Sequence, residues 1–335
     1  MERASTRKGL KVEHYSEKIE QAKVFIRKRM NNEAPSLKTS FKKLNDALFE
    51  GFEWNRIVTI AGLSASGKSL LLSQIRRDVV DYNPNEKLNI LAFEMEMLGV
   101  DQVSRDISSK TDLTTRELYS AGSKLTEQQY DTVCKTADKM KYYPIFIVDD
   151  VGTVDEIVHT ILNFVEENKL IEENRGLICT FDHSLLVKGT VGEDQEKLII
   201  DKLYKTLIQL KKYFETIKLK SLFIVLSQLN RSIEEPQRIT NPMLHYPTKN
   251  DLFASSAAFY CSDYVIITHK PAGIEGLGSY YGPSRGEDYP YGLPVFNPKD
   301  PQRAMIYWHI IKARFSSSQI LMMVENFKHS KIEEY

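Results

Sequence analysis

Residues 62–69 limit what this chain can fold into more than any other feature. They are Gly-Leu-Ser-Ala-Ser-Gly-Lys-Ser, the complete pattern G-x-x-x-x-G-K-S. An apolar run, Ile57–Ala61, precedes them, and a helical pattern follows from Leu70. Glycines let such a loop curl until its N–H groups point inward, and the N-terminus of the next helix favours the same negative charge. The segment therefore predicts a loop that holds the phosphates of a nucleotide between a strand and a helix.

Two side chains of this loop carry specific chemistry. Lys68 can reach the β- and γ-phosphates, and the hydroxyl of Ser69 can bind Mg²⁺. ATP and Mg²⁺ are the expected ligands. The residues expected to surround the nucleotide are Gly62, Leu63, Ser64, Ala65, Ser66, Gly67, Lys68, Ser69 and Leu70.

Short apolar runs alternate with helical patterns over most of the chain. This alternation predicts an α/β fold with a mainly parallel, doubly wound sheet and helices on both faces. Thr153 and Glu156 fit a capping box at the start of one helix, and another helix begins near Asp194. The expected strands are Ile57–Ala61, Leu88–Phe93, Ile145–Val148, Leu177–Phe181, Leu222–Leu226 and Tyr264–Thr268.

The C-terminal part breaks this alternation. Two apolar runs, Met305–Ile311 and Ile320–Val324, have no helix between them, so we expect an antiparallel hairpin that closes the sheet edge. The stretch between Pro271 and Pro301 is rich in Gly, Pro and Tyr. We expect a long, mobile loop there, and we leave open whether it has a functional role.

The first 35 residues form a separate, charge-rich segment. Their apolar residues recur at three- and four-residue steps, which predicts an amphipathic helix, and Asn31–Pro35 is the expected linker. We divide the chain into an N-terminal arm, 1–35, and a motor domain, 36–335. The pattern leaves open whether the helix packs on its own domain or on a neighbouring subunit. The apolar positions are Val12, Tyr15, Ile19, Ala22, Ile26 and Met30.

Composition narrows the function less than the motif does. The chain has 45 basic and 45 acidic residues, which argues mildly against a nucleic-acid binder, although a local basic channel can exist in a neutral protein. Its three cysteines form no CxxC pair and indicate reduced thiols. We expect neither a membrane span nor a secretory leader. We expect a cytoplasmic location.

Hydrolysis requires acids near the phosphates. Asp182 and Glu94 each follow an apolar run, and ligands of open α/β sheets lie outside the carboxyl ends of the strands. A solvated loop acid is the alternative for each. Asp149 and Asp150 also end a run and are rivals, and Glu96 competes with Glu94.

Seven motifs in a fixed order resemble a known family. Together they are similar to the motor domain of DnaB-type replicative helicases and their phage relatives, over about residues 37–335. The resemblance implies a RecA-like core, ATP hydrolysis, single-stranded DNA as a partner, and a homo-oligomer, most commonly a hexamer. It also implies a primase or loader as a partner, in a bacterial cell or a phage-infected host. The motifs are GLSASGKS, LAFEMEM, YYPIFIVDD, CTFDHSLLV, VLSQLNRSIEE, KNDLFASSAAFYCSDYVII and IIKARFSSSQ.

The resemblance assigns roles to five residues outside the loop. Glu94 matches the glutamate that activates water, and Asp182 matches the aspartate on the Mg²⁺ side. Gln228 matches the polar sensor of the γ-phosphate. Lys312 and Arg314 match a basic pair that enters the active site of the neighbouring subunit.

His183 and the N-terminal segment bear on the place of this chain within the family. The FDHSLLV and KARF wording is closer to phage primase-helicases than to the bacterial enzymes, where a tyrosine commonly takes the place of His183. We interpret His183 as a packed residue beside the site, with a catalytic role as the alternative. The family's globular N-terminal domain does not fit within residues 1–35, so we expect it to be absent and favour the docking-arm interpretation of the helix.

The DNA contacts also depart from the pattern. The family carries an arginine in the loop 251–256, and this chain has Phe253 instead, either packed or stacked on a base. The loop Lys188–Lys197 is a second candidate, with a plain surface loop as its alternative. The candidate DNA-binding residues are Lys188, Lys249, Asn250, Ser255 and Ser256.

Three functions remain in competition. The leading one is a helicase motor that translocates on single-stranded DNA. The second is a RecA-like recombinase, a filament ATPase or another ring ATPase that does not unwind DNA. The third, an interaction module on an inactive ATPase fold, is opposed by the intact loop and acids.

Overall fold

The computed structural model describes residues 11–122, 124–190, 192, 195–253, 256–278, 281–282, 292–314 and 317–335. The chain divides into two compact units, Met1–Ser36 and Leu37–Tyr335. In the first, helix α1 spans Tyr15–Met30, as the periodicity predicts. The ring of His14 caps its start by accepting the N–H of Ser16. In the last turn of α1, Arg29 donates to Ala34 O and Ser36 Oγ of the segment that follows.

One sheet forms the centre of the second unit. In its described part the order is β10-β9-β8-β6-β1-β5-β4-β2-β3, with β7 paired to β8. All pairs among β1 to β6 are parallel, and the pairs of β8 with β6, β7 and β9, and of β9 with β10, are antiparallel. The strands are β1 Arg56–Gly62, β2 Leu88–Glu94, β3 Ile145–Val148, β4 Gly176–Asp182, β5 Ser221–Gln228, β6 Tyr264–His269, β7 Phe296–Asn297, β8 Asp300–Ala313, β9 Gln319–Asn326 and β10 Lys331–Glu334. Each predicted run is a strand, and the mainly parallel sheet is confirmed.

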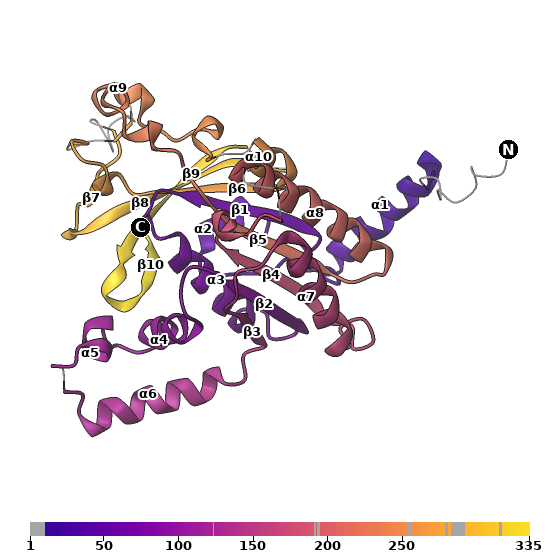
Figure 1. Cartoon of the computed structure of the whole chain (residues 1–335), viewed down its shortest axis with the longest axis horizontal. Coiled ribbons are helices and arrows are strands. Elements are labelled where there is room, and N and C mark those ends of the chain that lie inside the picture. The colour runs from indigo at the N-terminus through magenta and orange to yellow at the C-terminus, as the bar shows by residue number, and fades with distance from the viewer. Residues whose placement is uncertain are drawn as a thin grey trace. The chain divides into compact units, whose positions relative to one another are not determined.

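Helices cover both faces of the sheet, because alternate strand residues point to opposite sides. One core packs α7, α8 and α10 against one face, and the other packs α2 and α3 against the opposite face. Figure 1 shows α7 and α8 beside each other along the strands. The predicted capping box of Thr153 and Glu156 starts α7. These helices are α2 Lys42–Ala47, α3 Lys68–Asp81, α7 Val154–Glu167, α8 Glu196–Thr216 and α10 Ser256–Cys261.

The predicted C-terminal hairpin is confirmed as β8 and β9 and is extended by β10. The described part of the stretch 271–301 contains regular elements and packed side chains, where the sequence predicted only a loop. It contains β7 and the start of β8, and its apolar side chains form a third small core with Met305 and Tyr307. Aromatic and aliphatic residues spaced through this stretch fill the outer face of the hairpin. Its buried members are Ile274, Leu277, Tyr281, Leu293 and Val295.

Smaller helices complete the unit. Figure 1 shows α5 and α6 beyond α4, away from the sheet, and α9 near β7 at the other end. Among the described helices, none combines the length and the apolar character that a membrane crossing needs. The remaining elements are α4 Gly99–Lys110, α5 Thr115–Tyr119, α6 Glu127–Met140 and α9 Pro236–Thr240, with short 3-10 turns η1 Ser184–Leu186, η2 Arg231–Glu234, η3 Pro242–Leu244, η4 Lys249–Asp251, η5 Pro271–Gly273 and η6 Phe327–His329.

Candidate functional site

The phosphate loop joins β1 to α3, as its sequence predicts. Gly67 has φ +89°, in the left-handed region that glycine adopts without strain, and it caps the start of α3. At Gly62 an added Cβ would lie 2.3 Å from Ser66 Oγ and 2.5 Å from Thr268 O. The loop thus packs so closely on the end of β6 that only glycine fits at its first position.

Lys68 and Ser69 open α3 and face the cleft. The ammonium of Lys68 donates to Leu63 O at 2.8 Å. Burial disfavours its charged form and lowers the pKa of Lys68 to about 8, although the nearby carboxylates of Asp182 and Glu96 act in the opposite direction. The Lys68 ammonium, held beneath the loop in this way, is placed to bind phosphate oxygens.

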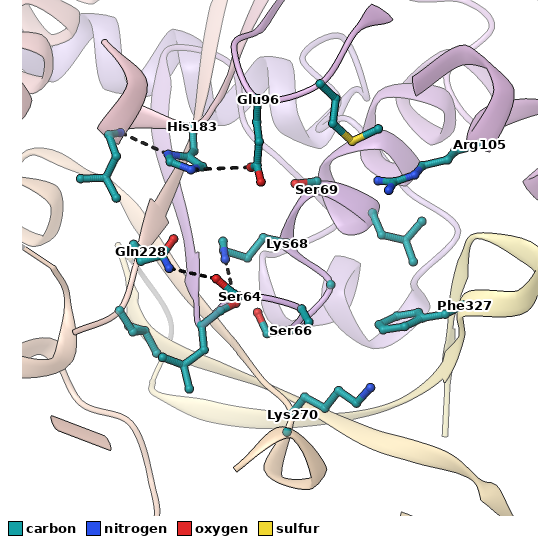
Figure 2. Close-up of a pocket in the computed structure, with 18 of the residues that line it drawn as sticks. Ser64, Ser66, Lys68, Ser69, Glu96, Arg105, His183, Gln228, Lys270 and Phe327 are labelled. Carbon is teal, nitrogen blue, oxygen red and sulfur yellow. Dashed lines mark hydrogen bonds and ion pairs between the residues drawn. The ribbon is translucent and has the colours of Figure 1, made fainter. Parts of the chain in front are cut away.

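The carboxyl ends of four parallel strands meet at this edge. Gly62 lies beside Gln228 in the pairing of β1 with β5, and Glu94 lies beside Asp182 in the pairing of β2 with β4. A cleft of about 1370 Å³ opens above them, lined by the loop and by Glu96, among others. Figure 2 shows Lys68, Ser69 and Glu96 pointing toward the same space.

Glu94, expected from the sequence as the base, does not line the cleft. Its side chain is 1% exposed and forms an ion pair with Arg76 beneath the cleft floor. Burial raises the pKa of Glu94, and Arg76 opposes that shift. Glu96, its rival, lines the cleft where β2 has ended and the chain bends outward. Asp182 is likewise not among the described residues that line the cleft, so the lining alone does not decide between the two acids, and Glu94 and Glu96 both remain candidates for the base.

Asp149, the other rival, accepts the N–H of Gly99 at 2.9 Å at the start of α4. Neither it nor Asp150 is among the described residues that line the cleft.

His183 lies next to Glu96. Its Nδ1 accepts the N–H of Leu185 at 3.3 Å, so a neutral ring carries its proton on Nε2, which is 3.6 Å from Glu96 Oε2. Burial lowers the pKa of His183 and favours that neutral form. The ring therefore limits the positions that the Glu96 carboxylate can take. This contact is consistent with the interpretation of His183 as a packed residue beside the site.

The residues present fit a magnesium ion. Asp182 is 3% exposed, and among the described residues its Oδ1 has no hydrogen-bond partner. A buried carboxylate oxygen without a partner is costly unless something charged binds it. The hydroxyl of Ser69 lines the cleft above. Oxygen ligands of this kind are the ones that Mg²⁺ prefers.

Gln228 links the phosphate loop to the segment expected to contact DNA. Its Nε2 donates to Ser64 Oγ at 3.3 Å, and its backbone O accepts the N–H of Phe253 at 2.9 Å. Phe253 itself lines the cleft. The aromatic residue that replaces the family's arginine therefore faces the nucleotide side.

Sequence reasoning missed several residues that line the cleft, among them Lys270, Arg105 and Phe327. Lys270 follows β6 directly, so the strand-end rule that selected Asp182 would have found it. Arg105 on α4 and Phe327 in η6 come from elements whose position no local pattern predicts. Lys270 lies 4.8 Å from the centroid of the Phe327 ring (Figure 2).

The DNA candidates differ in how they are placed. Lys188, Lys249, Asn250 and Ser256 are exposed, and Ser255 lies outside the described residues. The ammonium of Lys249 lies 5.9 Å from the centroid of the Phe259 ring on α10. These exposed residues lie in three parts of the fold, because Lys188 follows η1, Lys249 and Asn250 belong to η4, and Ser256 begins α10.

The basic pair lies at the opposite edge of the sheet. β8 runs antiparallel to β6 and ends beside Tyr264, the first residue of β6, so Lys312 and Arg314 are at the amino ends of the parallel strands. Lys312 donates to Phe259 O at 2.7 Å and Tyr260 O at 3.2 Å. Arg314 is 51% exposed and lies 3.3 Å from Asp263.

A loop of the sequence G-x-x-x-x-G-K-S between a parallel strand and a helix, with acids at the adjacent strand ends, defines a P-loop nucleotide-binding protein. Within that class, the sequence model of the DnaB-like helicase C terminal domain matches residues 36–277. The chain therefore belongs to this family, and its core is RecA-like.

Solved structures agree on the fold. One, described as an ATPase domain, superposes with a TM-score of 0.73 at 15% identity and covers 95% of this chain and 98% of that chain. Another, "The Structure Of A DnaB-Like Replicative Helicase And Its Interactions With Primase", has a TM-score of 0.72 at 15% identity over 94% of this chain. This chain spans 66% of that one. The sequence has no significant match among curated proteins.

Proposed function

We propose that this chain is the motor of a replicative DNA helicase, which hydrolyses ATP and moves along single-stranded DNA as a hexameric ring of identical subunits. One observation carries the proposal. The residues suited to bind phosphate lie at one edge of the sheet, and the exposed Arg314 lies at the other. A site that needs this arginine must therefore receive it from another subunit.

The roles of the site residues follow from their positions. Lys68 holds the β- and γ-phosphates, and Ser69 and Asp182 would hold Mg²⁺, which neutralises phosphate charge when it is bound. One of two acids at or just beyond the end of β2, Glu94 or its rival Glu96, orients the attacking water and accepts its proton, and His183 lies beside Glu96. Gln228 senses the γ-phosphate, because its amide lies over the loop and its backbone holds Phe253.

The DNA-facing role rests on the exposed residues of the segment after β5. Lys249, Asn250 and Ser256 can contact phosphates, with Ser255 and Lys188 as further candidates. Arg238 and Asp251 stiffen this segment through a buried ion pair, in which Asp251 is 3% exposed. A primase or a loader is the expected further partner, and the cytoplasm of a bacterial or infected cell the expected compartment.

Arg314 is proposed to act in the neighbouring site. Lys312, expected to accompany it, is engaged with backbone carbonyls of α10 in its own chain, so we assign it to supporting the end of β8. A ring or filament ATPase that does not unwind DNA remains the second candidate, because it would use the same nucleotide site.

The test is ATP turnover with and without single-stranded DNA, beside a mass measurement in solution. We expect turnover that rises with DNA and a mass near six subunits. Lys68→Ala should abolish turnover, since the charge on the β- and γ-phosphates is lost. Turnover that ignores DNA in a correctly assembled ring would favour the second candidate, and no turnover at all would refute both.

A further inference from the structure

Asp263 lies directly before β6, and its position is fixed by β1. Its backbone N–H donates to Ile57 O at 2.7 Å, and its carboxylate oxygen Oδ2 accepts the N–H of Ile57 at 2.9 Å. These two reciprocal hydrogen bonds to one residue of the neighbouring strand leave the carboxylate little freedom to move. The side chain of Asp263 is 4% exposed, so a fixed, buried anion lies at the amino edge of the sheet.

The register of the sheet brings Arg314 opposite this anion. β8 runs antiparallel to β6 and pairs Ala313 with Tyr264. Arg314 follows the first of these residues and Asp263 precedes the second, so the same register places the two charges across from each other. Nε of Arg314 lies 3.3 Å from Oδ1 of Asp263. Strand pairing therefore determines which acid Arg314 meets.

Charge balance does not require this contact. The ammonium of Lys211 on α8 lies 2.9 Å from the other carboxylate oxygen of Asp263 and already balances its charge. An ion pair with an arginine that is 51% exposed adds little to stability.

Orientation of the guanidinium is the better explanation. A contact at Nε holds the base of the group and leaves the four N–H groups of its two terminal nitrogens for another partner. Those two nitrogens form the planar edge that binds a phosphate group through two hydrogen bonds. An arginine held in this way is prepared for phosphate before a neighbouring subunit arrives.

We propose that Asp263 is a positioning residue for Arg314, which holds the guanidinium at Nε so that its terminal nitrogens face the nucleotide of the neighbouring subunit. This inference deepens the proposed function and rests on the action of Arg314 in trans. Asp263 itself would touch no phosphate. An arginine without this support still reaches the neighbouring site, so the loss of Asp263 should cost less turnover than the loss of Arg314.

The central test is Asp263→Asn, which removes the charge but keeps an oxygen that can accept the N–H of Ile57. We expect the variant to assemble and to bind a fluorescent ADP analogue as the wild type does. Its kcat should fall by about 100-fold, because displacements of about 1 Å have that effect on catalysis. In an Arg314→Ala background the same change should add nothing, because a positioning residue has no effect without the residue that it positions.

A rival explanation places the effect in the chain's own nucleotide site. Ile57 belongs to β1, which leads into the phosphate loop, so the loss of Asp263 could disturb that loop instead of Arg314. Mixtures of variants distinguish the two explanations, because the loop and the arginine of one site come from different chains in the proposed ring.

Each explanation predicts a different partner for recovery. Mixed with inactive Lys68→Ala, the Asp263→Asn chain supplies an intact loop and receives an intact Arg314, so turnover should exceed the sum of the two unmixed proteins. Mixed with inactive Arg314→Ala it should not, because both chains are then defective on the arginine side. A disturbed loop predicts the reverse pattern. Mass measurements must show that mixed oligomers form.

Two variants are matched controls. Asp78 on α3 is as deeply buried as Asp263, and its carboxylate also accepts a backbone N–H, that of Ser40, at 2.9 Å. Asp78→Asn therefore makes the same chemical change away from Arg314. Lys211→Met removes the other cation that contacts Asp263 and leaves Arg314 in place. Both should keep turnover near the wild-type rate.

The outcomes separate the inference from the proposed function. A wild-type kcat in Asp263→Asn, with active wild-type protein and impaired Arg314→Ala, overturns the inference and leaves the proposed function standing. Recovery with Arg314→Ala instead of Lys68→Ala also overturns it, and so does an equal loss of turnover in either control.

A second variant decides if Asp263→Asn does not fold. Asp263→Glu keeps the charge but moves it by one methylene group, so the carboxylate no longer holds Ile57 and Arg314 as before. It should lose turnover and recover only with Lys68→Ala, and a wild-type kcat there overturns the inference. Normal turnover of Arg314→Ala refutes action in trans and the inference with it, and an inactive wild type refutes the proposed function itself.

Discussion

Two clusters of charge lie at opposite edges of the same sheet, and they are built differently. At the carboxyl edge, Lys68, Arg76, Glu94 and Asp182 are each 8% exposed or less. Lys68 donates to Leu63 O of the phosphate loop and Arg76 pairs with Glu94, all within one chain. Packed groups of this kind have their geometry set before any ligand arrives.

The amino edge has one buried acid and several cations. Asp263 accepts the N–H of Ile57 and the ammonium of Lys211, each at 2.9 Å, and also faces Arg314. Its side chain is 4% exposed, but that of Arg314 is 51% exposed. The first cluster is completed by its own chain, whereas the second ends in a cation that another molecule can still reach. The comparison indicates where a neighbouring subunit would complete the site.

The largest expected effect tests this contrast directly. Arg314→Ala should lower turnover by about 10³–10⁵-fold, the range known for arginines that act on nucleotide triphosphates. Complementation between two inactive variants should restore part of the lost turnover. When inactive Arg314→Ala and inactive Lys68→Ala proteins are mixed, an intact loop from the first meets an intact arginine from the second, and some ATP hydrolysis should return.

Mass measurements must show that mixed oligomers form. A mixture that contains them and stays inactive would contradict action in trans by independent sites. Normal turnover of Arg314→Ala alone would refute any catalytic role of Arg314 in the neighbouring site.

The next effect lies within the carboxyl-edge cluster. The change to Gln at whichever of Glu94 and Glu96 is the base should reduce kcat by about 10²–10⁴-fold, the usual contribution of a general base, and should leave nucleotide binding intact. Glu94→Gln should in addition lower the free energy of unfolding by about 3–5 kcal/mol, because it leaves Arg76 buried without its counter-ion.

Turnover and thermal unfolding of both variants distinguish the two acids. Loss of turnover in folded Glu94→Gln but not in Glu96→Gln would identify Glu94 as the base, and the reverse result would identify Glu96.

A smaller effect concerns DNA beside the amino-edge cluster. Lys249 and Lys312 lie 5.9 Å and 5.1 Å from the centroid of the same Phe259 ring, which places a DNA candidate next to the basic pair. Binding to single-stranded DNA should weaken with salt, with a slope of about −0.7 per phosphate contact. Lys249→Ala should make that slope shallower by about one contact.

Titrations at several salt concentrations measure this slope, and Lys139→Ala, an exposed lysine on α6, is the control. An unchanged slope for Lys249→Ala would remove this residue from the DNA interface.

The smallest effect on the fold is expected from deleting residues 1–35. If α1 docks on a neighbouring subunit, the truncated chain should keep its melting temperature and form a weaker oligomer. Arg314 would then find fewer neighbouring sites, and turnover should depend more strongly on protein concentration. Calorimetry and sedimentation measure the two properties. A large drop in melting temperature with an unchanged oligomer would refute docking.

The sequence by itself determined the class of fold and the chemistry of the loop. Gly62 to Ser69 carry their function in residue types at fixed spacing, and each predicted strand is a short apolar run that alternates with helical patterns. These signals are local, so no distant contact is needed to detect them. The hairpin of β8 and β9 was visible for the same reason.

Tertiary structure decided which residues share a site. Glu94 and Glu96 are two positions apart in one motif, and only the packing of Arg76 from α3 against the first left the second to face the cleft. Phe327 and Arg105 reach that cleft from distant elements. The direction of β8 likewise placed Arg314 at the edge away from the loop. Such outcomes depend on contacts between segments far apart in the chain, and no local pattern contains them.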